Sequence, residues 1–482
     1  MNSASLPRQC LQLAIWLALA TTSTGPVQAA NLKLDLRNRI DSVFNPWNRS
    51  DSPGCALAVI SQGRIVYERG YGMANLDHGI AITPETVFYV GSVSKQFTAA
   101  NVALMASQGK LDLDADIRQY VPEMPAYSQP ITVRQLVHHT SGIRDIYTLM
   151  RLAGKRLEDV FPDQQALQLI ARQQELNFTP GSAFLYSNSG YFLLSEIVER
   201  LSQSSLREYA EQNIFLPLDM RDTHFHDSPG HVQPRTATSY QPNEDGSFRN
   251  SFLSNFDKVG AGGLYSTVRD LYKWDQNFYT GQVGGEAFLK TIQTGGKLSE
   301  GTQLDYAFGL RVSTYRGLPI VAHGGSMMGY KADFVQFPKQ QFSVLCLCNL
   351  GSINPTGLTR QVADIYLANQ FSAPAPERAA APVGGSNRGP APVTLSDSRI
   401  QALLGSYGSP ELESHLKITR SGNDLLAHQP DGSESKLIPL ADGNFRMGAL
   451  TLRVISNSDG SVQELRIDAG RARNFLFLPR PD

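Results

Sequence analysis

The stretch YVGSVSKQF, residues 89–97, places a serine and a lysine three positions apart, just after a glycine. Apolar residues at positions 93, 97, 100 and 104 then mark one face of a helix, and Gly109 is typical of its end. Residues three apart share a helix face, so the Lys95 ammonium is expected beside the Ser92 hydroxyl. A serine needs a nearby base or cation to become a nucleophile. The same spacing also occurs where a serine caps a helix and the lysine is solvated.

Two later stretches carry further candidate residues. In FTPGSAFLYSNSGYFLL, residues 178–194, Tyr186 and Asn188 lie in a polar loop directly before an apolar helix pattern. In HGGS, residues 323–326, two glycines follow an apolar strand and permit close approach of a ligand or backbone. Each stretch also has a structural interpretation, namely an asparagine cap with a packed tyrosine, and a histidine in a turn.

Taken in chain order, these three patterns resemble the motifs of the penicillin-recognising serine hydrolases. Within that family the likeness is closest to the class C β-lactamase-like branch, which includes DD-carboxypeptidases, D-aminopeptidases and esterases. Four longer stretches are similar to its signatures: ITVRQLVHHTSGI (131–143), FTPGSAFLYSNSGYFLLSEIVERLS (178–202), GAGGLYSTVRDLYKW (260–274) and HGGSMMGYKADFVQFP (323–338). The resemblance covers about residues 50–350. It implies an α/β fold, a β-lactamase/transpeptidase-like domain with an antiparallel sheet flanked by helices and a helical subdomain.

The resemblance also implies catalytic roles. Ser92 would be the acylated nucleophile, and Lys95 and Tyr186 would form the base and proton shuttle. Lys and Tyr both have ordinary pKa values near 10, so their titrations are coupled, and the sequence leaves open which of the two takes the proton. Ser94 is the less favoured nucleophile because it points elsewhere on the helix.

Substrate-binding roles follow from the same resemblance. Asn188 would contact the substrate and position Lys95, and the backbone N–H groups of Ser92 and Ser326 would form an oxyanion hole. His323 stands where β-lactamases usually carry lysine. A histidine with its reference pKa of about 6.5 would be only partly charged near neutral pH, which predicts weaker or pH-dependent binding of a substrate carboxylate. The expected substrate-binding residues are Asn188, His323, Gly324, Gly325 and Ser326.

The resemblance implies a serine hydrolase that acts through an acyl-enzyme on D-amino-acid-containing peptides, amides or small esters, and the N-terminal segment described below predicts that it is secreted. The histidine predicts that β-lactam hydrolysis is weak or absent, although a β-lactam remains a candidate ligand. One alternative is a sensor or scaffold that binds penicillin or cell-wall peptides and deacylates slowly or not at all. Another is a true class C-type β-lactamase. No cofactor and no metal are expected, and the adjacent His138 and His139 are interpreted as structural.

Composition narrows the class of partner. The 482 residues include 43 Lys and Arg against 44 Asp and Glu, for a net charge of -1, and no dense basic run occurs. This balance disfavours nucleic-acid binding. Hydrophobic residues at 41% and charged residues at 18% are typical of a globular chain. No feature of the sequence indicates an oligomeric state.

The N-terminal segment 1–30 has the pattern of a signal peptide. Arg8 precedes an apolar run over residues 11–20, and small residues at 27 and 29 follow. Cleavage is expected near Ala29 or Ala30, with a secreted or periplasmic product. The apolar run is too short to span a membrane, and no span is expected in the mature chain.

The rest of the chain divides by composition into three parts. Residues 31–371 carry the motifs and form the expected hydrolase domain. Residues 372–396 are rich in Pro, Ala and Gly and predict a linker. Residues 397–482 hold short alternating stretches between Gly, Asn, Asp and Ser, which predict an antiparallel β domain, a barrel or sandwich. It resembles the lipocalin-like domains that follow this hydrolase domain in some relatives. The resemblance implies either that it leans on the cleft and limits substrate size, or that it serves as a stability or oligomer module.

Strands are also predicted at both ends of the hydrolase domain. Residues 55–72 predict a β-hairpin, and residues 318–350 predict a meander with its turn at 338–341. The three cysteines beyond the signal peptide, Cys55, Cys346 and Cys348, all fall in these strands. They are interpreted as buried free thiols, with a single bridge from Cys55 to one of the other two as the alternative.

Overall fold

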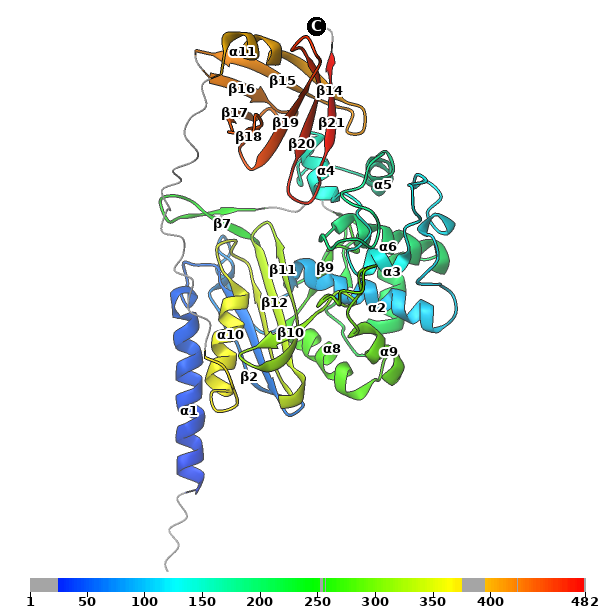
Figure 1. Cartoon of the computed structure of the whole chain (residues 1–482). Coiled ribbons are helices and arrows are strands. Elements are labelled where there is room, and N and C mark those ends of the chain that lie inside the picture. Colours follow the sequence, from blue (N-terminus) through cyan, green and yellow to red (C-terminus); the bar gives the residue numbers. More distant parts are fainter. Residues whose placement is uncertain (1–24, 252–254, 256, 375–394, 423, 481–482) are drawn as a thin grey trace, which may run out of the picture.

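A six-stranded antiparallel sheet lies between two groups of helices in the computed structural model, and a separate β-barrel stands at the C-terminal end (Figure 1). The structure describes residues 25–251, 255, 257–374, 395–422 and 424–480. The sheet order is β10-β11-β12-β13-β1-β2. Its strands are β1 (Cys55–Ser61), β2 (Arg64–Tyr71), β10 (Arg311–Tyr315), β11 (Leu318–Met327), β12 (Tyr330–Phe337) and β13 (Phe342–Cys348). The predicted hairpin and meander are therefore confirmed, and β13 pairs with β1 although Cys55 and Cys348 are 293 residues apart in sequence.

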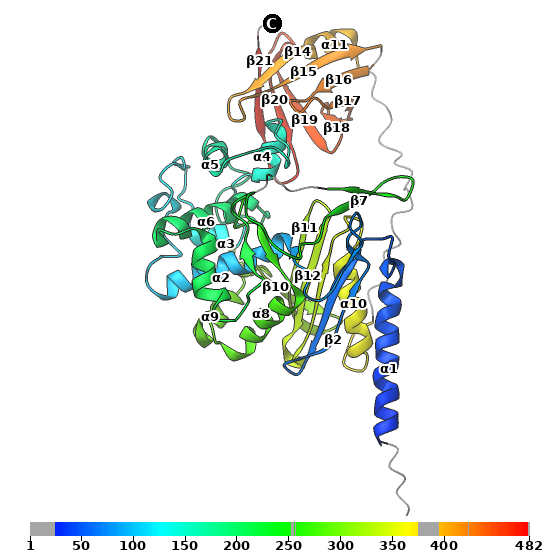
Figure 2. The ribbon, with the colours of Figure 1, turned by 180° about the vertical axis from the view of Figure 1, so that it is seen from behind.

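Both faces of this sheet are covered, which explains the continuous apolar runs in its central strands. Every residue of β13 is buried. One face packs against α1 (Gly25–Phe44) and α10 (Pro355–Tyr366), which run side by side in Figures 1 and 2. The other face packs against α8 (Val268–Thr280) and, through it, the helical subdomain.

The helical subdomain carries most of the remaining helices. The helix predicted after Ser92 is confirmed as a short 3-10 turn, η2 (Gly91–Val93), continued by α2 (Ser94–Ser107), and Gly109 beyond it has a positive φ of 69°. The other helices are α3 (Val133–Val137), α4 (Ile146–Leu152), α5 (Asp163–Ala171), α6 (Asn188–Ser202), α7 (Leu206–Ala210) and α9 (Gly285–Ile292). The short strands outside the large sheet and the barrel are β3 (Met73–Asn75), β4 (Ile80–Ala81), β5 (Phe88–Tyr89), β6 (His224–Phe225), β7 (Tyr240–Pro242), β8 (Phe248–Asn250) and β9 (Leu264–Ser266).

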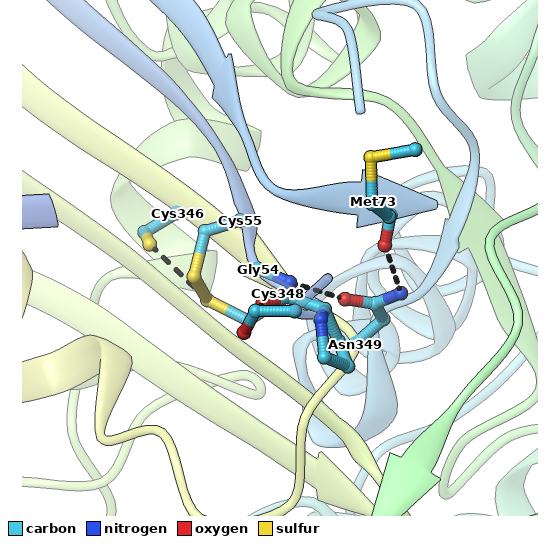
Figure 3. Close-up of a disulfide and its surroundings, with 8 residues drawn as sticks. Gly54, Cys55, Met73, Cys346, Cys348 and Asn349 are labelled. Carbon is cyan, nitrogen blue, oxygen red and sulfur yellow. Dashed lines mark hydrogen bonds between the residues drawn. A yellow bond between two sulfur atoms is a disulfide. The ribbon is translucent and has the colours of Figure 1, made fainter. Parts of the chain in front are cut away.

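A disulfide joins two neighbouring strands of the sheet, β1 and β13. The register places Cys55 of β1 directly opposite Cys348 of β13, and their sulfurs are bonded (Figure 3). The interpretation of all three cysteines as free thiols is therefore wrong, and the bridged alternative holds, because only position 348 faces position 55 in this register. Cys346 is a buried free thiol whose Sγ lies 3.5 Å from the Cys348 Sγ. Asn349, the next residue, adds hydrogen bonds beside the disulfide. Its Oδ1 accepts from the Gly54 N–H, and its Nδ2 donates to the Met73 carbonyl oxygen.

The C-terminal region forms a closed antiparallel barrel in which β14 also pairs with β21, so the predicted β domain is a barrel. Alternate residues of β15 are buried, which produces the alternating sequence pattern. The barrel begins after α11 (Asp397–Leu403) and comprises β14 (Gly405–Ser409), β15 (Ser414–Ser421), β16 (Asp424–His428), β17 (Glu434–Pro439), β18 (Phe445–Met447), β19 (Leu450–Ser456), β20 (Val462–Asp468) and β21 (Phe475–Arg480).

Two predicted segments fall largely outside the described residues. They are the linker, of which residues 375–394 are not described, and the signal peptide, of which residues 1–24 are not described. Helix α1 runs through the predicted cleavage site at 29–30. Within the described part of the chain, no helix combines the length and apolar character that a membrane span requires.

Candidate active site

Ser92 and Lys95 meet at the junction of η2 and α2. The Lys95 side chain is fully buried, and its Nζ lies 3.3 Å from the Ser92 Oγ. It also donates to the Asn188 Oδ1 at 2.9 Å and to the Ala261 carbonyl oxygen at 2.5 Å. The three acceptors surround the nitrogen, so the Ser92 oxygen occupies the one direction that Asn188 and Ala261 leave open.

Burial of Lys95 changes its titration. Desolvation holds the pKa of Lys95 well below its ordinary value, Asp145 partly opposes this effect, and the positive charge of Arg471 adds to it. In its neutral form, the amine would donate to Asn188 and Ala261 and keep a lone pair for the proton of the Ser92 hydroxyl.

Ser94 is engaged elsewhere. Its Oγ donates to the Gly91 carbonyl at 2.5 Å and accepts from the Leu264 backbone N–H at 3.2 Å. These bonds tie the start of α2 to β9. The structure thus gives Ser94 a scaffold position and directs it away from Lys95, in agreement with the sequence expectation.

Tyr186 lies next to Lys95. The Lys95 Nζ lies 4.8 Å from the centroid of its ring, and the ring of His139 packs 4.2 Å from it. The Tyr186 hydroxyl is buried and makes no hydrogen bond of good geometry to the described residues. Burial raises the pKa of Tyr186, while the nearby Ser92 hydroxyl and the Arg471 charge act to lower it. Tyr186 is therefore a protonated phenol at neutral pH.

Asn188 is fixed by a carboxylate that the sequence analysis did not select. The Asp145 Oδ2 accepts from both the backbone N–H and the Nδ2 of Asn188, each at 2.7 Å. This contact settles the amide orientation, with the Oδ1 toward Lys95. Asn188 is the first residue of α6, and its side chain does not cap that helix. Asp145 itself caps α4 through the Thr148 N–H, and that cap was the only signal its sequence offered.

His323 is buried and neutral. Its Nδ1 lies 2.7 Å from the Gly324 carbonyl oxygen and must donate to it, so its Nε2 accepts from the Tyr306 hydroxyl at 3.0 Å. Burial lowers the pKa of His323 to about 3. The expectation of a partly charged histidine is wrong, because the sequence could not show that this strand end is enclosed by Tyr306.

Ser326 and Ser92 are brought together by two glycines. Gly91 has a positive φ of 57°, and a Cβ there would lie 2.6 Å from the Ser326 nitrogen. A Cβ on Gly325 would lie 1.9 Å from the Val90 carbonyl oxygen. Only glycine permits this approach of β11 to η2, which places the N–H groups of Ser92 and Ser326 at one edge of the site.

These residues line a cleft of about 710 Å³. Ser92, Tyr186, Asn188, His323, Gly324, Gly325 and Ser326 all line it. Its charged rim consists of Arg311, Lys331 and Arg471, none of which the sequence motifs indicated. None of the described residues that line the cleft is an Asp or Glu.

Arg471 reaches the cleft from the barrel. It lies in the loop between β20 and β21, residues 469–474, and its guanidinium carbon is 4.7 Å from the centroid of the Tyr186 ring. The expected position of the C-terminal domain against the cleft is thus seen in a specific contact. No short motif could indicate it, because the residue is distant in sequence from every other site residue.

Arg144 holds that loop in place. Its fully buried guanidinium donates to the carbonyl oxygens of Arg473 and Asn474 at 3.0 and 3.1 Å, and to the Glu411 carboxylate at 2.9 Å. Asn177 adds bonds to the backbone of Arg471 and Arg473. The β20–β21 loop is therefore docked by its main chain, and the Arg471 side chain is exposed toward the cleft.

Comparison with known proteins agrees with this geometry. A D-aminopeptidase of Gluconobacter oxydans (strain 621H) is 27% identical over 301 residues, 62% of this chain and 56% of that protein. A D-aminopeptidase of Brucella anthropi is 28% identical over the same shares of the two chains. The chain thus spans little more than half the length of these curated relatives.

Solved structures share the fold. The octameric penicillin-binding protein homologue from Pyrococcus abyssi superposes with a TM-score of 0.61 at 19% identity, over 94% of this chain and 100% of that one. The D-amino acid amidase from Ochrobactrum anthropi SV3, complexed with D-phenylalanine, gives 0.59 at 20% identity, over 70% and 100%. The family described as Beta-lactamase matches residues 40–379, a span that contains the serine, lysine, tyrosine and histidine described above. The chain belongs to the beta-lactamase family, in its penicillin-recognising serine hydrolase branch.

Proposed function

We propose that the protein is a serine hydrolase that forms an acyl-enzyme on Ser92 and acts on amides, peptides or small esters that contain D-amino acids. The observation that carries the proposal is the Lys95 environment, in which a buried amine with a lowered pKa has two of its contacts fixed and the third directed at Ser92. The relatives named D-aminopeptidase support the D-amino-acid substrate class.

In the proposed acylation, neutral Lys95 takes the Ser92 proton as the Oγ attacks the substrate carbonyl carbon. The carbonyl oxygen becomes an oxyanion beside the backbone N–H groups of Ser92 and Ser326. Tyr186, whose phenol is protonated, donates its proton to the leaving amine or alcohol as the scissile bond breaks. The proton on Lys95 then restores the phenol. Attack by water on the acyl ester completes the cycle and returns the Ser92 hydroxyl.

Weak or absent β-lactam hydrolysis is part of the proposal. Its support is the neutral, enclosed His323, which supplies no positive charge where β-lactamases usually carry lysine. The N-terminal pattern of residues 1–30 supports a secreted or periplasmic protein, which the N-terminal sequence of the mature chain would test.

The test is hydrolysis of D-amino acid amides, D-alanyl-D-alanine peptides, p-nitrophenyl esters and a chromogenic cephalosporin, with Ser92→Ala as the control. We expect turnover of an amide, peptide or ester that Ser92→Ala abolishes, and an intact-mass increase on Ser92 during turnover. A stable penicillin adduct without turnover of any substrate would instead identify a binding sensor. Faster hydrolysis of the cephalosporin than of every amide and ester would identify a β-lactamase.

A further inference from the structure

The charge around the cleft has one sign. Arg311, Lys331 and Arg471 line it, and none of the described residues that line it is acidic. A substrate that presents an ammonium group would meet only like charges there, and a substrate that presents a carboxylate would meet the opposite charge.

Two of the three rim cations already have partners. Arg311 forms an ion pair with Asp305 at 2.9 Å and lies over the rings of Phe184 and Tyr306. The Lys331 Nζ donates to the Ser326 Oγ at 2.6 Å. Arg471 differs from both, since within the described part of the chain no carboxylate lies within ion-pair distance of its guanidinium.

Arg471 is also held in place at the cleft that it lines. Its carbonyl oxygen accepts from the Asp145 N–H at 3.3 Å and from the Asn177 Nδ2 at 3.0 Å, so its backbone is fixed next to the residue that orients Asn188. Its guanidinium lies over Tyr186 and leaves its N–H groups free to donate. A guanidinium presents paired N–H donors that match the two oxygens of a carboxylate.

We propose that Arg471 is a specificity-determining residue that binds a substrate carboxylate, so that the enzyme prefers carboxylate-bearing acyl compounds to those with a free ammonium group. The inference rests on the proposed function and narrows its substrate class. The proposed preference for a carboxylate over a free ammonium group differs from the preference that the name D-aminopeptidase implies for the relatives. The carboxylate can belong to the acyl part or to the leaving group, and the test separates these two sources.

The experiment compares substrates in matched pairs. N-acetyl-D-alanyl-D-alanine and its C-terminal amide test a carboxylate on the leaving group, and succinyl- and acetyl-D-alanine p-nitroanilide test one on the acyl part. In Arg471→Gln, the ratio of kcat/KM for the charged member to kcat/KM for the neutral member should fall about 10- to 100-fold for one pair. A ratio removes the effect of the Arg471 charge on the pKa values of Lys95 and Tyr186, because that effect applies to both members.

Arg473→Gln is the matched control, because Arg473 is exposed in the same loop but does not line the cleft. It should leave both ratios unchanged, and Arg471→Lys should recover part of the loss. Unchanged ratios in Arg471→Gln, or wild-type preference for D-alanine p-nitroanilide with its free ammonium group, would overturn the proposal.

The failure of this proposal can be told from the failure of the proposed function. If Ser92-dependent hydrolysis is present and the ratios do not change, the function stands and the role of Arg471 falls. If no substrate is hydrolysed, a binding measurement still tests the carboxylate site. Calorimetry would compare how N-acetyl-D-alanyl-D-alanine and its amide bind to Ser92→Ala, with and without Arg471→Gln. Binding that is absent, or equal for acid and amide, excludes a carboxylate site at Arg471.

Discussion

The base of the cleft and its rim are built in opposite ways. At the base, Lys95 and Asn188 are buried and their polar atoms are engaged by neighbouring groups. At the rim, Arg471 has a fixed backbone but an exposed side chain that comes from the barrel. Burial and fixed hydrogen bonds tune a pKa, whereas an exposed guanidinium can exchange water for a ligand. The difference suggests that the base determines the chemistry and the rim selects the substrate.

One dipeptide connects the two regions. Arg144 donates to the barrel loop and to Glu411, and the adjacent Asp145 accepts from Asn188 in the base. The Ser189 hydroxyl, which donates to the Arg144 carbonyl at 2.6 Å, ties this dipeptide to α6. Variants of these residues therefore separate effects on the base from effects on the rim.

The largest effect is expected from Ser92→Ala, which removes the proposed nucleophile. We expect kcat/KM to fall about 10⁴-fold or more for every substrate, charged or neutral. The melting temperature should stay close to that of the wild type, because Lys95 keeps its bonds to Asn188 and Ala261. Residual hydrolysis above one per cent would assign the acyl group to another residue.

The next effect concerns the docking of the rim. Arg144→Met leaves the buried Glu411 without its ion-pair partner, and loss of a buried charge partner typically costs about 3–5 kcal/mol. Chemical denaturation should show the loss, and the barrel should become more accessible to proteases. Arg134→Met is the control, because Arg134 pairs with the exposed Asp114 and such pairs contribute about 0–1 kcal/mol. Equal losses in the two variants would show that the buried network does not dock the barrel.

A smaller effect, confined to the base, is expected from Asp145→Asn. The Asp145 carboxylate accepts through both oxygens, from Asn188 at Oδ2 and from the Thr148 N–H at Oδ1, whereas an amide has only one acceptor oxygen. One set of bonds would be lost, Asn188 and Lys95 would be displaced, and kcat would fall about 100-fold. Asp145 acts to raise the pKa of Lys95, so its neutralisation should move the acid limb of the pH profile to lower pH. A fall in kcat without this shift would point to misfolding instead of a positioning role, and circular dichroism provides the control.

The sequence predicted the base of the site far better than its rim. Ser92, Lys95, Tyr186, Asn188 and His323 all lie in short patterns beside glycines or helix starts, where local spacing determines geometry. Arg144, Asp145 and Arg471 act through contacts between segments 43 to 329 residues apart in sequence, such as the bond from Arg144 to Arg473. No local periodicity reports such contacts. For the same reason the sequence left undecided which cysteine pairs with Cys55, because the bridge to Cys348 depends on strand register.

The smallest effect is a pH dependence that should be missing. With its pKa lowered to about 3, His323 is protonated only in strong acid and stays neutral from pH 5 to pH 8. A histidine with its ordinary pKa would lose its charge within this range and place an inflection near pH 6.5 in kcat/KM for carboxylate substrates. We expect no such inflection, since the charge that meets the carboxylate belongs to the arginine on the rim. Tyr306→Phe sharpens the test, because it removes the hydroxyl that donates to the His323 Nε2. If an inflection near pH 6.5 then appears only in this variant, the enclosure by Tyr306 keeps the histidine neutral, whereas an inflection already present in the wild type would place the carboxylate at His323.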